Sequence, residues 1–269
     1  MKNYLMTIVF LFLMVGCEDV VQVDVPTDQT RLAIDALIRV ADISSSSVQI
    51  LIKAKETSSF FENVEAAKLD QVTLTNEGNN STLELIENSP GSGLYVAFWP
   101  ASQLTSGELR LNITYKNEQY EAHTSFVPTV PIDRLIQGDD TLFSGDETEV
   151  IISYTDVPNR VDFYLFDFDF DEYLVSEDTF YPGQSFEFSY FYDGEFLSGQ
   201  EINIGIIGVD EDFYNYMNQI IVQSGGDQGP FQTPSATVRG NIINKSNPDN
   251  FALGYFAVSQ SYNELLIIE

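Results

Sequence analysis

Short runs in which every second residue is apolar recur along the chain from residue 31 onward. A period of two places the apolar side chains on one face of an extended strand and the polar ones on the other. Turn residues, such as those at 76–80 and 89–93, separate successive runs. The pattern therefore predicts half-buried β-strands. In the first half of the chain the runs lie at residues 31–40, 47–55, 72–74, 83–85, 94–98, 109–115 and 120–126.

Pro128 and Pro131 interrupt this series and predict a linker, because proline removes a backbone donor from strand pairing and stiffens the path. Seven short strands in residues 31–127 are typical of an immunoglobulin-like β-sandwich. Residues 131–269 continue with strand-like runs and hold 25 of the 41 acidic residues. They predict a second β-sandwich domain, acidic and rich in aromatic residues. The predicted fold class is thus mainly β, with two β-sandwich domains and one short helix in the second.

That helix is predicted at residues 210–223, where acids at the start suit the positive end of a helix dipole. Four side chains recur at helical spacing and form the expected buried stripe: Phe213, Tyr216, Met217 and Ile220. Tyr214 lies at the border of this stripe, so it is a candidate for partner contact, with a packed border tyrosine as the alternative. The other runs of the second half lie at residues 149–154, 161–171, 185–192, 201–209, 235–243, 251–259 and 263–268.

The N-terminus predicts export. Residues 5–15 form an apolar run behind Lys2, which is shorter than the about 20 residues that span a bilayer. Gly16 followed by Cys17 resembles a bacterial lipobox, which predicts a signal peptide over residues 1–16, lipidation of Cys17 and a tether over residues 17–30. An ordinary secretory signal with a chance cysteine is the alternative, although Cys17 is the only cysteine of the chain. Glu18 and Asp19 resemble the export signal of surface lipoproteins in Bacteroidota, which points to the cell surface of the outer membrane.

The net charge of the chain limits the kinds of molecule that it can bind. The formal net charge is −29 at pH 7, so nucleic-acid phosphates and an anionic lipid surface would both be repelled. Acyl chains on Cys17 are therefore the expected membrane anchor, since two or more such chains hold a protein stably. With its one cysteine lipidated the chain can form no disulfide, and its folding depends on the burial of apolar side chains.

The sequence shows no catalytic motif. His123 is the only histidine, and it lies beside Glu121 on the polar side of an alternating run. A single histidine cannot build a multi-histidine zinc site, and the Gly-x-Ser-x-Gly pattern of a nucleophile elbow is absent. We therefore expect a surface histidine and no enzymatic activity.

The densest acidic cluster consists of Asp167, Asp169 and Asp171, which alternate with phenylalanines. In a strand the three carboxylates share one face, and we favour a solvated acidic strand face. A calcium site is the alternative, because neighbouring carboxylates attract a hard cation, although Glu172 stands where an EF-hand loop needs glycine. A carboxylate pair for glycoside hydrolysis is the third interpretation. Apart from this calcium alternative no cofactor is expected.

An aromatic stripe and a short motif complete the candidates. The stripe is expected in the core, with an exposed platform for a sugar or peptide as the alternative. It consists of Phe186, Phe188, Tyr190 and Tyr192. Asp140-Thr141-Leu142 resembles the short O-glycosylation signal of Bacteroidota proteins, which makes Thr141 a candidate glycosylation site.

The order and spacing of several segments resemble the Bacteroidota lipoprotein family of the domain of unknown function 4249. These segments are Cys17-Glu18-Asp19 and residues 23–26, 32–35, 212–216, 230–234, 240–242 and 253–256. Ala33 and Ala36 stand where the family often has Val and Gly. The resemblance implies an accessory of a TonB-dependent outer-membrane receptor that helps to capture or take up a nutrient, and it implies no catalytic residues. A structural or adhesive surface protein without a transport role is the alternative, and a glycosidase using acids of residues 156–212 ranks third.

Overall fold

The computed structural model describes residues 29–59, 62–142, 145–194, 196–224 and 236–269. The chain is mainly β, as the alternating pattern predicts. The strands are β1 Leu32–Val40, β2 Val48–Glu56, β3 Glu65–Ala66, β4 Gln71–Asn76, β5 Ser81–Glu84, β6 Ile86–Glu87, β7 Leu94–Trp99, β8 Glu108–Tyr115, β9 Glu118–Ser125, β10 Ile132–Gln137, β11 Thr148–Thr155, β12 Phe163–Asp167, β13 Tyr173–Glu177, β14 Ser185–Tyr192, β15 Glu201–Val209, β16 Ile243–Asn244 and β17 Leu253–Ile267. The helices are α2 Ala101–Leu104 and α3 Glu211–Ser224.

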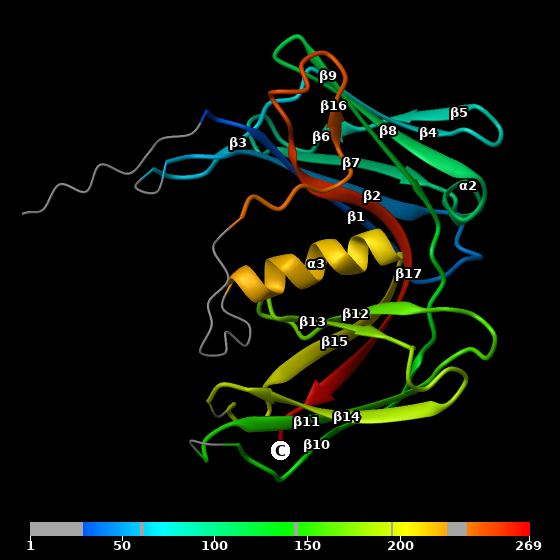
Figure 1. The fold of residues 1–269 in the computed structure, drawn as a ribbon, viewed down its shortest axis with the longest axis vertical. Coiled ribbons are helices and arrows are strands. Elements are labelled where there is room, and N and C mark those ends of the chain that lie inside the picture. The colour runs from blue at the N-terminus through cyan, green and yellow to red at the C-terminus, as the bar shows by residue number, and fades with distance from the viewer. Residues whose placement is uncertain (1–28, 60–61, 143–144, 195, 225–235) are drawn as a thin grey trace, which may run out of the picture.

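The strands form three sheets (Figure 1). The largest has nine strands, in the order β13-β12-β15-β17-β1-β2-β7-β6 with β3 paired to β2. A five-stranded sheet, β16-β9-β8-β4-β5, covers one half of it, and a three-stranded sheet, β10-β11-β14, covers the other. The nine-stranded sheet bends between its halves, and α3 lies inside the bend (Figure 1).

β17 connects the two halves of the molecule. Its first part pairs in parallel with β1, from Leu253 opposite Ala33 to Gln260 opposite Val40. Its second part pairs antiparallel with β15, from Ser261 opposite Ile207 to Ile267 opposite Glu201. The sequence predicts two separate strands here, at 251–259 and 263–268, whereas the structure has one strand of 15 residues.

Each sandwich has its own core. The first is mainly aliphatic, with Ile34, Ile50 and Leu111 among its buried side chains. The second contains stacked aromatic rings, and the predicted aromatic stripe of β14 belongs to it. Tyr190 stacks on Phe168 with 3.7 Å between ring centroids. The core interpretation of the stripe is therefore confirmed, because Tyr192 is buried and Phe186, Phe188 and Tyr190 are partly buried against the same core.

The predicted helix is also confirmed, as α3. The carboxylate of Asp210 accepts a hydrogen bond of 2.8 Å from the backbone N–H of Phe213, so Asp210 caps the helix N-terminus. Phe213 is buried against Leu165 of β12 and Tyr255 of β17. The sequence pattern does not predict the four-residue helix α2, which follows Pro100. Within the described ranges no helix is long and apolar enough to cross a bilayer. The predicted signal peptide, Cys17 and the tether up to residue 28 lie outside the described residues.

The expected strand over residues 161–171 is wrong beyond Asp167. The chain turns there, because Asp169, Phe170 and Asp171 all have positive φ, at 65°, 50° and 63°. The N–H of Phe168 donates to the carbonyl of Glu172 at 2.9 Å and closes the turn, which leads into β13. The three aspartates therefore do not share a strand face. Of residues 235–243, Ile243 alone belongs to a strand, among those that the structure describes.

The segment that the prolines mark as a linker is packed rather than exposed. Thr129 and Val130 are buried, and Val127 bridges to Ser259 of β17. A Cβ on Gly208 would lie 2.2 Å from the carbonyl oxygen of Pro128, so the segment lies directly on β15. The division into domains at 31–127 and 131–269 stays a prediction, but β17 pairs with strands of both parts.

We expect the native protein to resist proteolysis at residues 128–131. A protease cleaves a segment that can unfold locally and enter its active site, and this segment is held against β15 and β17. A protease that cuts before apolar residues should cleave elsewhere first, and the Thr129–Val130 bond only after global unfolding. Mass spectrometry of timed digests gives the order of cleavage. Early fragments of about 100 and 140 residues would contradict this expectation and support an open linker.

Candidate functional site

A groove of about 800 Å³ lies between α3 and the nine-stranded sheet. Figure 1 shows α3 beside β1 and β2 of the upper half of this sheet. The side chains of a strand alternate between its faces, so one face of β1 and β2 packs into the first core and the other lines the groove. The residues that line it include Leu37, Arg39, Leu51, Lys53, Lys55, Tyr173, Phe213, Tyr216, Met217, Ile220 and Tyr255.

Three aromatic rings form the part of the groove where α3 meets β17. The ring of Tyr255 lies 4.7 Å from that of Phe213 and 5.0 Å from that of Tyr216, centroid to centroid. Burial raises the pKa of Tyr216 to about 12, and the charge of Asp35 adds to this shift. The Tyr216 hydroxyl is therefore protonated at neutral pH and can donate a hydrogen bond.

The stripe that the helical spacing predicts is only partly buried. Phe213 is 4% exposed, whereas Tyr216, Met217 and Ile220 are half-buried and line the groove. Tyr214 points to another side of α3, where its ring lies 5.2 Å from that of Phe163 of β12. A packed border tyrosine is thus what the structure shows, and a contact role for Tyr214 stays a prediction.

The basic residues of the groove come from β1 and β2. Arg39 pairs with Asp167 at 2.7 Å, and Lys53 pairs with Asp35 at 3.1 Å. Lys55 is exposed and has no ion-pair partner among the described residues. Asp171 also lines the groove.

The three aspartates of the predicted calcium site are held by different partners. Asp167 faces Arg39, and one Asp169 oxygen accepts from the N–H of Asn203 at 3.3 Å. Two groups of three ligating side chains have their atoms within 4.8 Å of one another in the described part of the chain, and neither includes Asp167, Asp169 or Asp171. The structure therefore does not bring this predicted set together as a metal site.

One of the two groups is buried and consists of Asp156, Asp162 and Asp178. Arg160 Nε donates to Asp162 at 2.5 Å, and the N–H of Gly183 donates to Asp156 at 2.6 Å. The donor types suit a divalent cation. The side chains are 2–6% exposed, so a sugar chain cannot reach them as it would reach glycosidase carboxylates. This group has no signature in the sequence, because isolated acids 6 to 22 residues apart follow no metal-binding spacing.

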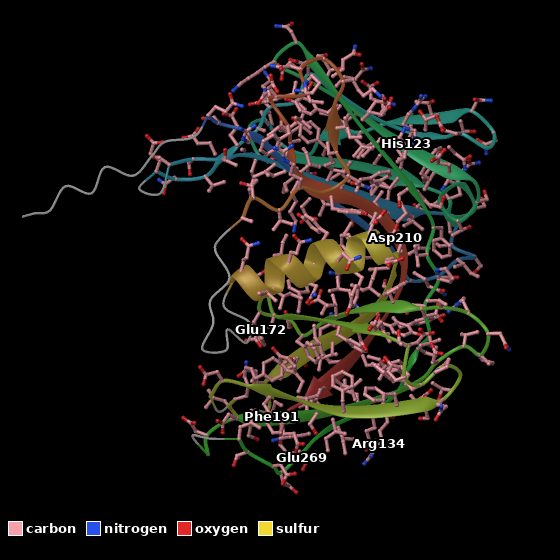
Figure 2. All side chains as sticks on the ribbon, viewed as in Figure 1. His123, Arg134, Glu172, Phe191, Asp210 and Glu269 are labelled. Atoms are coloured by element: carbon pink, nitrogen blue, oxygen red, sulfur yellow. The ribbon has the colours of Figure 1, made fainter. Side chains whose placement is uncertain are left out.

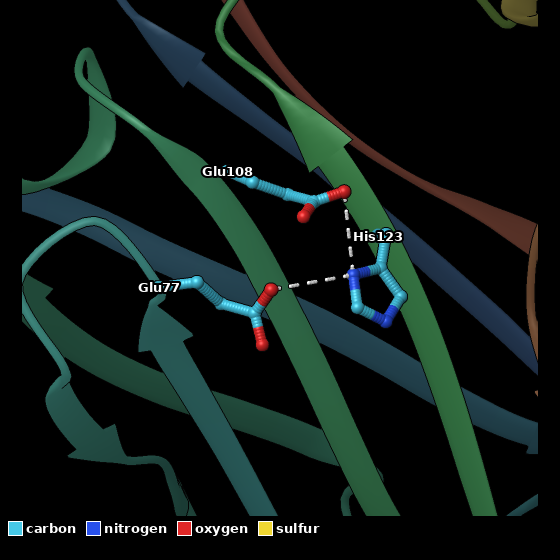
Figure 3. A group of neighbouring side chains, drawn as sticks. All are labelled: Glu77, Glu108 and His123. Carbon is cyan, nitrogen blue, oxygen red and sulfur yellow. Dashed lines mark ion pairs between the residues drawn. The ribbon is translucent and has the colours of Figure 1, made fainter.

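The other group surrounds His123 on the outer face of the five-stranded sheet (Figure 3). Nδ1 lies 3.5 Å from an oxygen of Glu108 and 3.9 Å from one of Glu77. Nε2 faces Glu121 at 3.4 Å. The imidazole and two carboxylates are donors that can hold a divalent transition metal. The expectation of a surface histidine beside Glu121 agrees with this position.

Figure 2 shows His123 on the five-stranded sheet, away from Asp210 at the start of α3. Thr141 is exposed in the connection between β10 and β11, which leaves it accessible for the predicted modification. The preceding N–H of Asp140 donates to Glu149 at 2.9 Å and holds this connection.

Comparison with protein families gives a match over residues 18–264. The chain belongs to the family of the domain of unknown function DUF4249. No curated protein matches this DUF4249 chain in sequence. Among solved structures, the red sea bream transglutaminase matches with 7% identity and a TM-score of 0.23. The match covers 91% of the DUF4249 chain and 32% of the transglutaminase, so the chain spans about a third of that protein, and a score this low says nothing of shared fold or activity.

We expect Tyr214→Ala to lower the free energy of unfolding by about 1–3 kcal/mol, because it removes a half-buried ring packed on Phe163. Urea unfolding of the variant measures this loss. Phe180→Ala is the matched control, since Phe180 is 85% exposed, and it should change stability by less than about 0.5 kcal/mol. Equal stability of Tyr214→Ala and the native protein would contradict a packing role for Tyr214.

The buried carboxyl of Asp162 predicts a pH dependence. Burial raises the pKa of Asp162 above its ordinary value of 3.8. Between that value and the raised pKa the folded state binds more protons than the unfolded state, so stability falls as pH rises through this interval. Asp162→Asn should make the fall smaller, as urea unfolding from pH 3.5 to 7 would show. The exposed Asp193→Asn is the control and should leave the pH profile unchanged; an identical profile in Asp162→Asn would contradict this assignment.

Proposed function

We propose that this DUF4249 protein is a lipid-anchored binding protein on the outer face of the outer membrane. It serves as an accessory of a TonB-dependent transporter and captures a ligand for uptake. The observation that carries the proposal is the groove beside α3, whose volume of about 800 Å³ falls within the range of ligand sites. The lipobox-like sequence at Cys17 supports the anchor.

Binding is a better account of the groove than catalysis. Apolar and aromatic side chains with a few charged groups line it, which is the usual composition of a ligand site. His123 and the buried aspartates lie outside this lining. The lining does hold two carboxylates, Asp35 and Asp171, but Asp35 is paired with Lys53 at 3.1 Å, and no described histidine lies beside them to complete an acid–base pair.

A structural or adhesive role is the second candidate, and one observation favours it. Phe98 of β7 and Ile86 of β6 are 59% and 73% exposed on the nine-stranded sheet. Leu51 is opposite Val96, and Val96 is opposite Ile86, so apolar side chains run across three neighbouring strands of this face. Exposed apolar patches of this kind mark contact with another protein.

Cys17→Ala should release the folded protein from the membrane, because acyl chains are its expected anchor. Membrane fractionation measures the release, and an unchanged melting temperature controls for folding. The native lipoprotein, extracted in mild detergent, should co-purify with an outer-membrane receptor of the TonB-dependent class, identified by mass spectrometry. Firm retention of Cys17→Ala in the outer membrane would contradict the anchor. Co-purification with surface proteins of other classes alone would favour the adhesive role.

A further inference from the structure

The two walls of the groove differ in chemistry. The α3 wall consists of apolar and aromatic side chains: Phe213, Tyr216, Met217 and Ile220. The opposite wall, on β1 and β2, carries Leu37 and Leu51 together with the cationic side chains of Arg39, Lys53 and Lys55. A molecule that lies along the groove therefore meets an apolar surface on one side and cationic groups on the other.

The charge of the groove departs from that of the whole chain. The chain has 12 basic residues and a formal net charge of −29, yet three of the basic residues line this one groove. The acidic residues of the lining are Asp35 and Asp171. An anion that avoids most of this protein surface thus meets no net repulsion from the side chains that line the groove.

The pairing of the three cations indicates which of them a ligand would engage. Arg39 is held by Asp167 at 2.7 Å, and both side chains are half-buried. Lys53 and Asp35 form an exposed pair at 3.1 Å, which is weak enough to rearrange. Lys55 lies two residues further along β2 on the same face, opposite Ala33, without an ion-pair partner among the described residues.

We propose that the groove binds a small amphiphilic anion, with its apolar part against α3 and its anionic group at Lys55 and Lys53. This inference rests on the proposed function, since it names the class of ligand that the binding protein captures. Burial of the apolar part supplies most of the affinity, because it scales with the area removed from water. The lysines add little to the affinity, because exposed ion pairs are weak. Their positive charge instead sets the preference for an anion over a cation of similar size.

The test uses the mature chain, residues 17–269 with Cys17→Ala, so that neither an acyl chain nor the apolar run of the predicted signal peptide enters the groove. The probes are dodecanoate and dodecyltrimethylammonium, both below their micelle concentrations and measured by isothermal titration calorimetry. The two are similar amphiphiles of opposite charge, and the slightly longer alkyl chain of the cation would by itself favour the cation. We expect one site per protein, which binds dodecanoate at least fivefold more tightly than it binds dodecyltrimethylammonium. The negative net charge of the chain, −29 at full length, favours the cation elsewhere on the surface, so this preference must come from the groove.

Two pairs of variants locate the site. Lys55→Glu should weaken dodecanoate binding about fivefold and narrow its preference over the cation. Lys68→Glu makes the same change at an exposed lysine outside the groove and should leave the preference unchanged. Ile220→Ala should weaken both probes, whereas Val222→Ala, on α3 but outside the groove lining, should weaken neither. Melting temperatures confirm that each variant is folded.

The outcomes separate this inference from the proposed function. No dodecanoate binding up to millimolar concentration, equal binding of both probes, or equal effects of Lys55→Glu and Lys68→Glu would overturn the ligand class. Receptor co-purification of the native lipoprotein would then still support the accessory role. Probe binding as expected without any receptor partner would uphold the ligand class and contradict the accessory role.

Discussion

The backbone pairing of β17 is the interaction on which the architecture depends. Its 15 residues donate and accept hydrogen bonds to β1 on one half of the molecule and to β15 on the other. Paired backbone groups are costly to leave unsatisfied once buried, so the two halves of the sheet cannot separate without losing this ladder. The sandwiches are therefore two cores built on one shared sheet, and the buried segment at Thr129 and Val130 follows from the same arrangement.

The bend of that sheet also creates the groove. On a flat sheet, α3 would contact only one face of neighbouring strands. In the bend, Phe213 is buried against Leu165 and Tyr255, while the rest of α3 leaves space before β1 and β2. The helix is thus fixed along one side and open along the other. Most of the groove lining comes from β1, β2, β17 and α3, with Asp171 added from the turn before β13, so largely regular elements hold these side chains in place.

The charge of the groove differs from the charge of the rest of the molecule. Among the described acidic residues of the second half, more than half are exposed, and their mutual repulsion opposes the approach of other anions to this surface. Cross-strand pairing brings Lys53 and Lys55 beside β1, where their charge faces an apolar helix. The proposed ligand class follows from this local contrast rather than from the overall charge. The buried aspartates and the His123 group are separate features, each held by its own neighbours.

The amino-acid sequence by itself determined the local structure. Period-two runs predicted most strands, helical spacing and Asp210 predicted α3, and the order of short segments indicated the family. Only the tertiary structure decided that residues 253–267 form one strand, because a strand that changes partners has no local signature. It also decided the turn after Asp167, where burial of Phe168 and a closing hydrogen bond outweigh the alternation of Phe and Asp. Lys55 of β2 and Tyr216 of α3 line the same groove although they are far apart in the sequence. Only the packing of the strands and the helix decides that they lie near each other.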